Sequence, residues 1–210
     1  MILIGMFDSP FVRRVAVSMK LLGFAFEHRN WSVGADQARI RQYNPLGRVP
    51  TLVLDDGEVL FESSAILDWL DQQVGPERAL LPPAGAPRRQ ALRLMAMATG
   101  AAEKGVAQLY EGAFRPAEKR HEPWVARCRG QMEDALAQLE AAVAAGATGS
   151  WLLGERMSQA DITVIAAFTF LSEALSLDRA RYPALSALAQ RGEVLPVFRE
   201  FHLPFFVPQG

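Results

Sequence analysis

The sequence predicts an α/β region followed by an all-α region, and three observations support this fold class. Residues 1–78 alternate short β-like runs with helical runs, whereas residues 88–210 are rich in Ala and Leu at helical spacing. Between them, residues 79–87 contain Pro82, Pro83 and Pro87, and proline lacks an amide donor and disfavours a helix in the residue before it. We therefore expect two domains, 1–78 and 88–210, joined by a linker over 79–87, an organisation that 210 residues accommodate.

The first strand and the first helix have clear signals. Residues 1–6 are apolar but are soon followed by charged side chains, so they predict a buried strand and not a signal peptide. Ser9 suits a helix N-cap, and Pro10 suits the first helical position, where its missing amide costs nothing. Apolar residues then recur at steps of three and four, and Gly23 suits the end of the helix.

The remaining elements of the first region complete the order β-α-β-α-β-β-α. Residues 55–58, Asp-Asp-Gly-Glu, predict the turn of a hairpin. We expect a strand over 26–31, a short helix over 36–42, the two hairpin strands over 51–54 and 59–61, and a helix over 63–73.

The second region predicts a bundle of helices around one central buried helix. Ser158 and Asp161 form a capping box with Asp in place of Glu, and the apolar run 162–171 follows directly. The other expected helices cover 88–114, 123–145, 182–190 and 196–201.

The composition excludes several functional classes. The chain has 22 Lys and Arg against 23 Asp and Glu, a net charge of −1, which gives no general attraction to nucleic acid or to an anionic membrane. No apolar run reaches the ~18 residues of a membrane span, and the zinc motif H-E-x-x-H and the glycine-rich phosphate loops are absent. We expect no metal. The single cysteine, Cys128, cannot form an internal disulfide, so we expect a reducing, intracellular compartment and interpret Cys128 as a small buried apolar residue.

Four short motifs are specific in their order and spacing when taken together. They are SPFVRR at 9–14, NPLGRVPTL at 44–52, FESSAI at 61–66, and the Ser158/Asp161 capping box. With these motifs the chain resembles the cytosolic glutathione transferase family over essentially its whole length, and the Ser-Pro-Phe string is similar to serine-type members, bacterial or tau-like. The resemblance implies a thioredoxin-like N-terminal domain and a helical C-terminal domain.

The resemblance implies that Ser9 is the catalytic residue. Ser9 stands at an expected helix start, where unpaired amides and the helix dipole favour an anion. A thiol bound there would be stabilised as the thiolate, with the Ser9 hydroxyl as hydrogen-bond donor. The working thiol would then belong to glutathione and not to the chain.

The same resemblance implies a glutathione-binding set of Arg48, Val49, Pro50, Glu62 and Ser63. A cis Pro50 would turn the backbone of Val49 towards the peptide of glutathione, and Arg48 would meet the glycyl carboxylate. Ser63 at a helix start would suit the γ-glutamyl carboxylate, and Glu62 would take the ammonium group.

Ordinary structural roles also fit these residues. Ser9 and Ser63 suit plain helix caps, Glu62 a first-turn acid, Pro50 a loop proline and Arg48 a solvated surface residue. For the pocket of the electrophilic substrate, the candidates suggested by the family are Phe7, Phe11, Tyr110 and Phe114. Aromatic residues at helical spacing are more often part of a core than of a pocket.

The resemblance implies a cytoplasmic homodimer that conjugates the glutathione thiolate to a hydrophobic electrophile, an activity of detoxification. Two alternatives remain open. One is a non-catalytic binding or regulatory protein of the same fold. The other is a glutathione-dependent isomerase or dehalogenase, although maleylacetoacetate isomerases have a Ser-Ser-Cys type string where this chain has Asp8, Ser9 and Pro10.

Overall fold

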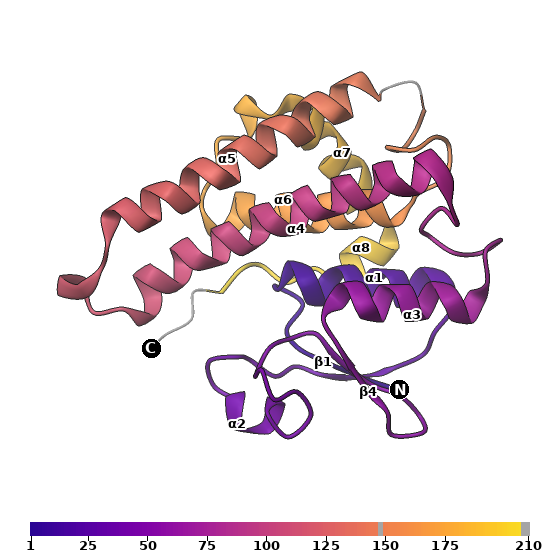
Figure 1. The fold of residues 1–210 in the computed structure, drawn as a ribbon, viewed down its shortest axis with the longest axis horizontal. Helices are drawn as coiled ribbons and strands as arrows, with labels where there is room; N and C mark the ends of the chain where they lie inside the picture. The colour runs from indigo at the N-terminus through magenta and orange to yellow at the C-terminus, as the bar shows by residue number, and fades with distance from the viewer. Residues whose placement is uncertain (147–148, 207–210) are drawn as a thin grey trace.

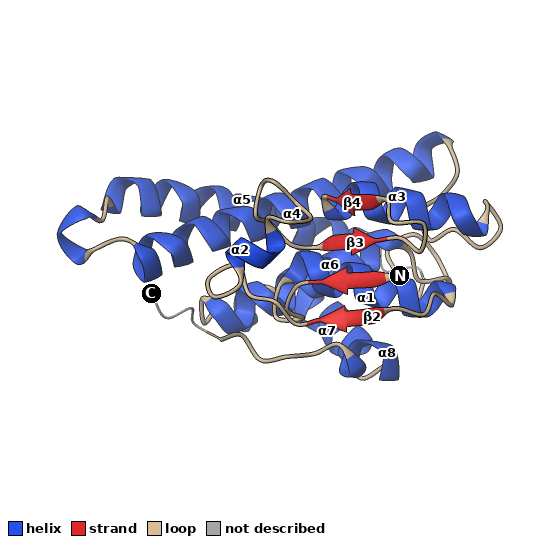
Figure 2. Cartoon of the chain, turned by 90° about the horizontal axis from the view of Figure 1, so that it is seen from below, coloured by secondary structure: helices blue, strands red, loops and turns tan. Residues whose placement is uncertain are grey.

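A four-stranded mixed sheet forms one end of the molecule. The computed structural model describes residues 1–146 and 149–206. The sheet has the order β2-β1-β3-β4 and consists of β1 (Ile2–Ile4), β2 (Glu27–Arg29), β3 (Thr51–Val53) and β4 (Val59–Phe61). Strand β1 pairs parallel with β2 and antiparallel with β3, and β3 pairs antiparallel with β4 across the expected hairpin (Figure 2). The α/β character predicted for the first region is confirmed.

Helices α1 (Pro10–Leu22) and α3 (Ser63–Val74) lie across one face of this sheet (Figure 1). Helix α1 begins and ends where its cap signals predict: the Ser9 hydroxyl accepts a hydrogen bond from the Val12 amide at 3.5 Å, and Gly23 has φ 85°. The short helix α2 (Gln37–Ile40) comes between β2 and β3. The apolar side of α1, including Val12, is fully buried.

The second region is helical, as predicted. Its helices are α4 (Gly85–Phe114), α5 (Glu122–Ala145), α6 (Gln159–Ala174), α7 (Pro183–Glu193) and α8 (Pro196–Glu200), with short 3₁₀ turns at Ala117–Lys119 and Arg179–Arg181. Helix α4 begins inside the expected linker, because Pro87 falls in its first turn, where a missing amide is tolerated. Cys128 is completely buried in α5.

Helix α6 is the centre of the helical region. The amide and hydroxyl of Ser158 donate to Oδ2 of Asp161 at 2.8 and 2.7 Å, and the Leu152 amide donates to Oδ1 at 2.8 Å. The predicted capping box is present, and Asp161 is fully buried. Because α6 also packs against α1, one continuous core connects the sheet region with the helical region (Figure 1).

A partly buried ion pair adds a polar link between the two regions. Arg13 of α1 donates to both carboxylate oxygens of Glu193 at 2.7 and 2.5 Å, and also to the Phe198 carbonyl at 2.9 Å. The Arg13 side chain is only 4% exposed. None of the helices within the described ranges is long and apolar enough to cross a membrane.

Candidate functional site

The loop before β3 and the start of α3 together line a shallow, open pocket. All five residues expected to bind glutathione lie in its wall. Arg48, Val49 and Pro50 come from the loop, Glu62 is the single residue between β4 and α3, and Ser63 is the first residue of α3. The other lining residues are Phe11, Asn44, Leu46 and Phe61.

Asn44 holds the loop in place, a role that the sequence analysis missed. Its side chain is 1% exposed, its Nδ2 donates to the Arg48 carbonyl at 2.9 Å, and its Oδ1 accepts from the Leu46 amide at 3.0 Å. The Thr51 hydroxyl donates to the same Arg48 carbonyl at 3.2 Å. The Val49–Pro50 peptide bond is cis, as the resemblance implies. Asn44 is the first residue of the motif at 44–52, but the sequence analysis gave Asn44 no role.

The start of α3 offers hydrogen-bond donors to an anion. Ser63 is fully buried, and its hydroxyl accepts a hydrogen bond from Nη2 of Arg14 at 2.7 Å while donating to Oε1 of Glu62 at 3.3 Å. The first amides of α3 have no partner within the helix, so the helix end carries partial positive charge. Glu62 stands at the N-cap position with φ 71° and ψ 115°, a backbone conformation that non-glycine residues rarely adopt.

Ser9 is the N-cap of α1 and is not among the residues that line this pocket. Phe11, in the first turn of α1, does line it. Ser9 therefore stands at the helix end next to the pocket, where the helix dipole favours negative charge.

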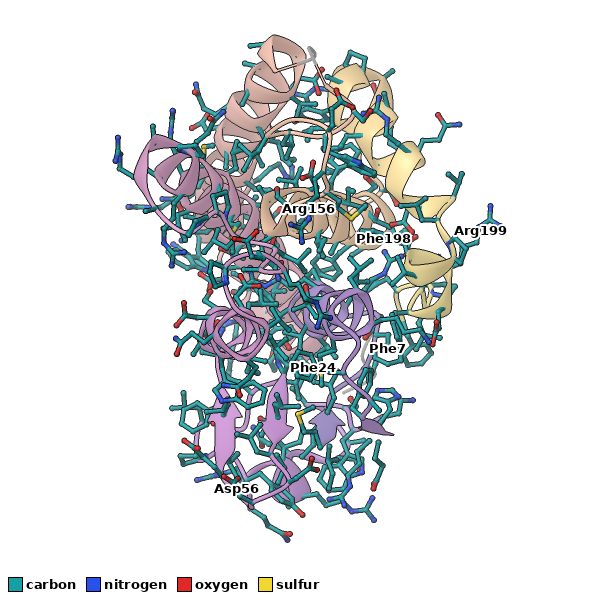
Figure 3. The ribbon with its side chains drawn as sticks, turned by 90° about the vertical axis from the view of Figure 1, so that its right-hand side faces the viewer. Phe7, Phe24, Asp56, Arg156, Phe198 and Arg199 are labelled. Atoms are coloured by element: carbon teal, nitrogen blue, oxygen red, sulfur yellow. The ribbon has the colours of Figure 1, made fainter. Side chains whose placement is uncertain are left out.

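The four aromatic candidates do not form one cluster. Tyr110 and Phe114 of α4 stack edge to face with ring centroids 5.0 Å apart, and both are partly exposed. Phe11 lines the pocket. Phe7 instead stacks on His28 with centroids 3.8 Å apart and meets Phe201 edge-on at 5.1 Å, beside the segment that follows α8 (Figure 3).

Helix α4 places ionisable side chains near the pocket and near the first loop, residues 5–9 between β1 and α1. Burial raises the pKa of Tyr110, the negative charge of Asp8 raises it further, and the positive charge of Arg48 opposes both. Arg48 also approaches Glu103 of α4, with Nη2 and Oε1 4.0 Å apart. Burial raises the pKa of Asp8, although hydrogen bonds from the backbone of Phe206 and Ser9 oppose that change.

Comparison with known proteins gives the family. Residues 3–78 match the family model of the glutathione S-transferase N-terminal domain, and residues 122–191 match that of the C-terminal domain. A solved glutathione transferase family member from Pseudomonas fluorescens, with bound glutathione, is 35% identical with a TM-score of 0.84, over 97% of this chain and 99% of that one. The chain belongs to the glutathione S-transferase family.

Two other relatives bear on the function. A glutathione S-transferase from Methylobacterium radiotolerans, solved in complex with glutathione sulfonate, is 30% identical with a TM-score of 0.88, over 100% of this chain and 95% of that one. The maleylacetoacetate isomerase of Pseudomonas aeruginosa is 27% identical over 209 residues, which cover 90% of this chain and 89% of the isomerase.

Proposed function

We propose that this glutathione S-transferase family protein binds glutathione and transfers its thiolate to a hydrophobic electrophile. The observation that carries the proposal is the pocket, because the loop that contains Pro50 and the N-terminal end of α3 both line it. Such a space offers backbone partners for a peptide and donors for a carboxylate side by side. The two solved relatives with glutathione or glutathione sulfonate support the choice of ligand.

Each part of glutathione has a proposed partner. The backbone of Val49 pairs with the peptide of the ligand, while the hydroxyl and amide of Ser63 receive the γ-glutamyl carboxylate and Glu62 receives the ammonium group. Arg48 receives the glycyl carboxylate. Its contact with Glu103 is long, and the two side chains are 59% and 56% exposed, so this ion pair contributes little and does not hold Arg48 away from the ligand.

Ser9 acts on the sulfur in this proposal. The thiol proton passes to solvent, and the thiolate is stabilised by the Ser9 hydroxyl and by the positive end of α1. The sulfur then attacks an electrophilic carbon, a C–S bond forms, and the displaced electron pair leaves with the departing group. Phe11, Tyr110 and Phe114 provide the apolar surface for the electrophile. Phe7 does not contact the electrophile in this proposal; its contacts with His28 and Phe201 hold the loop between β1 and α1 in place.

A series at Ser9 tests this role with 1-chloro-2,4-dinitrobenzene as the electrophile. Ser9→Ala should lower kcat about 10²–10³-fold, the usual effect of removing a donor to a developing anion. Its effect on stability should be near the lower limit of ~0.5–2 kcal/mol, because the cap hydrogen bond measures 3.5 Å.

Two further variants separate the chemistry from the helix cap. Ser9→Thr keeps both the cap acceptor and the donor, so it should retain most turnover. Ser9→Asp keeps the cap acceptor but has no proton to donate at neutral pH, so it should fold normally and lose turnover. Normal turnover in the Ala or Asp variant would refute the role of Ser9.

Glutathione-dependent isomerisation is the second candidate, favoured by the near full-length similarity to maleylacetoacetate isomerase. An isomerase would convert maleylacetoacetate with glutathione present but not consumed, whereas a transferase consumes one glutathione per turnover. Following glutathione loss alongside substrate loss separates the two activities. A chain that binds glutathione but turns over neither substrate would instead be a binding or regulatory protein.

Homodimerisation and a cytoplasmic location, with a role in detoxification, are also part of the proposal and rest on the family. Light scattering coupled to size-exclusion chromatography gives the mass in solution and tests the dimer directly.

A further inference from the structure

The first loop is tied to β2, which lies at the opposite edge of the sheet from β4. Nε2 of His28 lies 2.8 Å from the Gly5 carbonyl oxygen, and the Gly5 amide donates to the Arg29 carbonyl at 3.0 Å. A carbonyl oxygen only accepts hydrogen bonds, so Nε2 of His28 carries the hydrogen and donates it. Residues of β2 therefore hold both polar backbone groups of Gly5.

Gly5 is the point at which the first loop meets both α1 and the loop that contains Pro50. Its φ is 133°, and a Cβ atom there would lie 2.6 Å from Cγ2 of Val12 and 2.8 Å from Cβ of Val49. The Val12 amide donates to the Ser9 hydroxyl, and Val49 lines the pocket. The anchored glycine is thus in close contact with the elements that carry the site.

A tight turn connects Gly5 to Ser9. The Ser9 amide donates to the Met6 carbonyl at 3.2 Å, which closes a turn of four residues. Phe7 is the second residue of this turn, and its ring stacks on the His28 ring with centroids 3.8 Å apart and an angle of 11° between the planes. His28 therefore holds the first loop at two points, the Gly5 carbonyl and the Phe7 ring, and the turn held in this way ends at Ser9.

His28 itself is not part of the pocket wall. The residues proposed to bind the peptide of glutathione, 48–50 and 62–63, lie next to β3 and β4, and their loop has its own anchor in Asn44. A change at His28 should therefore displace the Ser9 hydroxyl more than it displaces the peptide-binding residues.

We propose that His28 is a positioning residue for catalysis: through the Gly5 carbonyl and the Phe7 ring it places the Ser9 hydroxyl at the sulfur of glutathione. This inference rests on the proposed function. A displacement of about 1 Å at a catalytic group can cost about 10²-fold in rate. Loss of His28 should therefore lower kcat and make the bound thiol less acidic, while glutathione still binds.

The test compares wild type with His28→Leu and His28→Gln. Leucine keeps an apolar contact with Phe7 but has no donor for the Gly5 carbonyl, whereas the side-chain amide of glutamine has a donor with about the reach of Nε2. Calorimetry measures the affinity for glutathione, and turnover of 1-chloro-2,4-dinitrobenzene gives kcat. The ultraviolet absorbance of the bound thiolate, followed against pH, gives the pKa of the bound thiol.

We expect His28→Leu to lower kcat about 10- to 100-fold and to change the affinity for glutathione less than about threefold. The pKa of the bound thiol should rise by about 1, which corresponds to a tenfold loss in the stabilisation of the thiolate. His28→Gln should recover most of the kcat and the thiol pKa of wild type. Glu27→Gln is a matched control on the same strand, since that side chain is exposed and pairs with Arg29, and it should behave as wild type in all three measurements.

A normal kcat and a normal thiol pKa in His28→Leu would overturn the inference. A parallel loss of glutathione affinity, kcat and thermal stability that His28→Gln does not restore would also overturn it, because that pattern indicates a merely structural role. If wild type binds no glutathione, or if Ser9→Ala turns over normally, the proposed function itself fails, so the two failures are distinguishable.

A shorter amide keeps the test usable if His28→Leu does not fold. His28→Asn then replaces it, because the amide of asparagine is one methylene shorter than that of glutamine and does not reach the Gly5 carbonyl. His28→Asn should show the same loss of kcat and the same rise in the thiol pKa. Wild-type values in His28→Asn would overturn the inference.

Discussion

Glu62 combines a strained backbone with a proposed role in the site, and its replacement separates the two. With φ 71° and ψ 115°, Glu62 is one of two non-glycine residues with positive φ in the part of the chain that the structure describes. Such a conformation costs of the order of 1–3 kcal/mol. Glycine adopts it freely but loses about 0.5–1 kcal/mol more conformational entropy on folding than alanine does.

The comparison of Glu62→Ala with Glu62→Gly isolates the strain, because both variants lose the carboxylate and differ only in backbone freedom. Taken near the middle of their ranges, the two terms give a glycine variant that is more stable than the alanine variant by about 1 kcal/mol. For a chain of this size, that difference corresponds to a shift of about 2–4 °C in Tm. Both variants should bind glutathione more weakly than wild type and to the same extent, because neither has a partner for the ammonium group.

Urea unfolding followed by circular dichroism measures the stability, and calorimetry with glutathione measures the binding. Glu58 is a matched control: it is also an exposed glutamate next to β4, but its φ is not positive. There, Gly should be less stable than Ala by about 0.5–1 kcal/mol, so the sign reverses. An alanine variant at 62 that is as stable as the glycine variant, or more so, would refute the reasoning.

Three further predictions follow from buried polar groups. Glu193→Gln should destabilise the protein by about 3 kcal/mol, because it leaves the charge of Arg13 buried and unpaired. The double variant Arg13→Met/Glu193→Leu removes both charges, so it should unfold at a higher urea concentration than Glu193→Gln does. Asp161→Asn should cost about 1–3 kcal/mol in urea unfolding, because the new amide nitrogen cannot accept the hydrogen bonds that a carboxylate oxygen accepts, and unchanged stability would contradict this. The third concerns Glu111, whose pKa is lowered from 4.5 chiefly by a hydrogen bond from the His121 amide. The carboxylate of Glu111 therefore stabilises the fold above about pH 4.5, and this contribution is lost as the pH falls through the lowered pKa. The difference in unfolding free energy between wild type and Glu111→Gln should shrink in acid. A difference that grows in acid would contradict the lowered pKa.

The elements with strong local signals were predicted correctly from the sequence. Helix α1 has a serine cap, a proline at its first position and a terminal glycine, and all three act as expected. The Ser158/Asp161 capping box is likewise present at the start of α6. These signals work because they depend on contacts within one turn of the chain.

Boundaries without such signals were less accurate. The strand expected over 26–31 is only Glu27–Arg29, because the sheet pairs no more of it with β1. Helix α4 begins at Gly85, since a proline in the first turn does not stop a helix.

The candidate site shows the same division between local and long-range information. The residues at 48–50 and 62–63 were named in advance, because each group belongs to one short string. Asn44 and Arg14 received no role, because their importance comes from partners elsewhere: the Arg48 carbonyl for Asn44, and Ser63 and α6 for Arg14. The environment of Phe7 was also not predictable, since its neighbours His28 and Phe201 are distant in sequence.

The sequence by itself determined the order of elements and the caps of α1 and α6, because these depend on residues that are close together in the chain. Its short motifs also carried the family resemblance, and that resemblance implied the cis Pro50. Only the tertiary structure decided that the loop containing Pro50 and the start of α3 share one pocket, that Asn44 holds that loop, and that the buried Arg14 donates to Ser63. Burial and the pairing of charges are properties of contacts between distant segments, so the position of Arg14 beside Ser63 becomes visible only when the chain is folded.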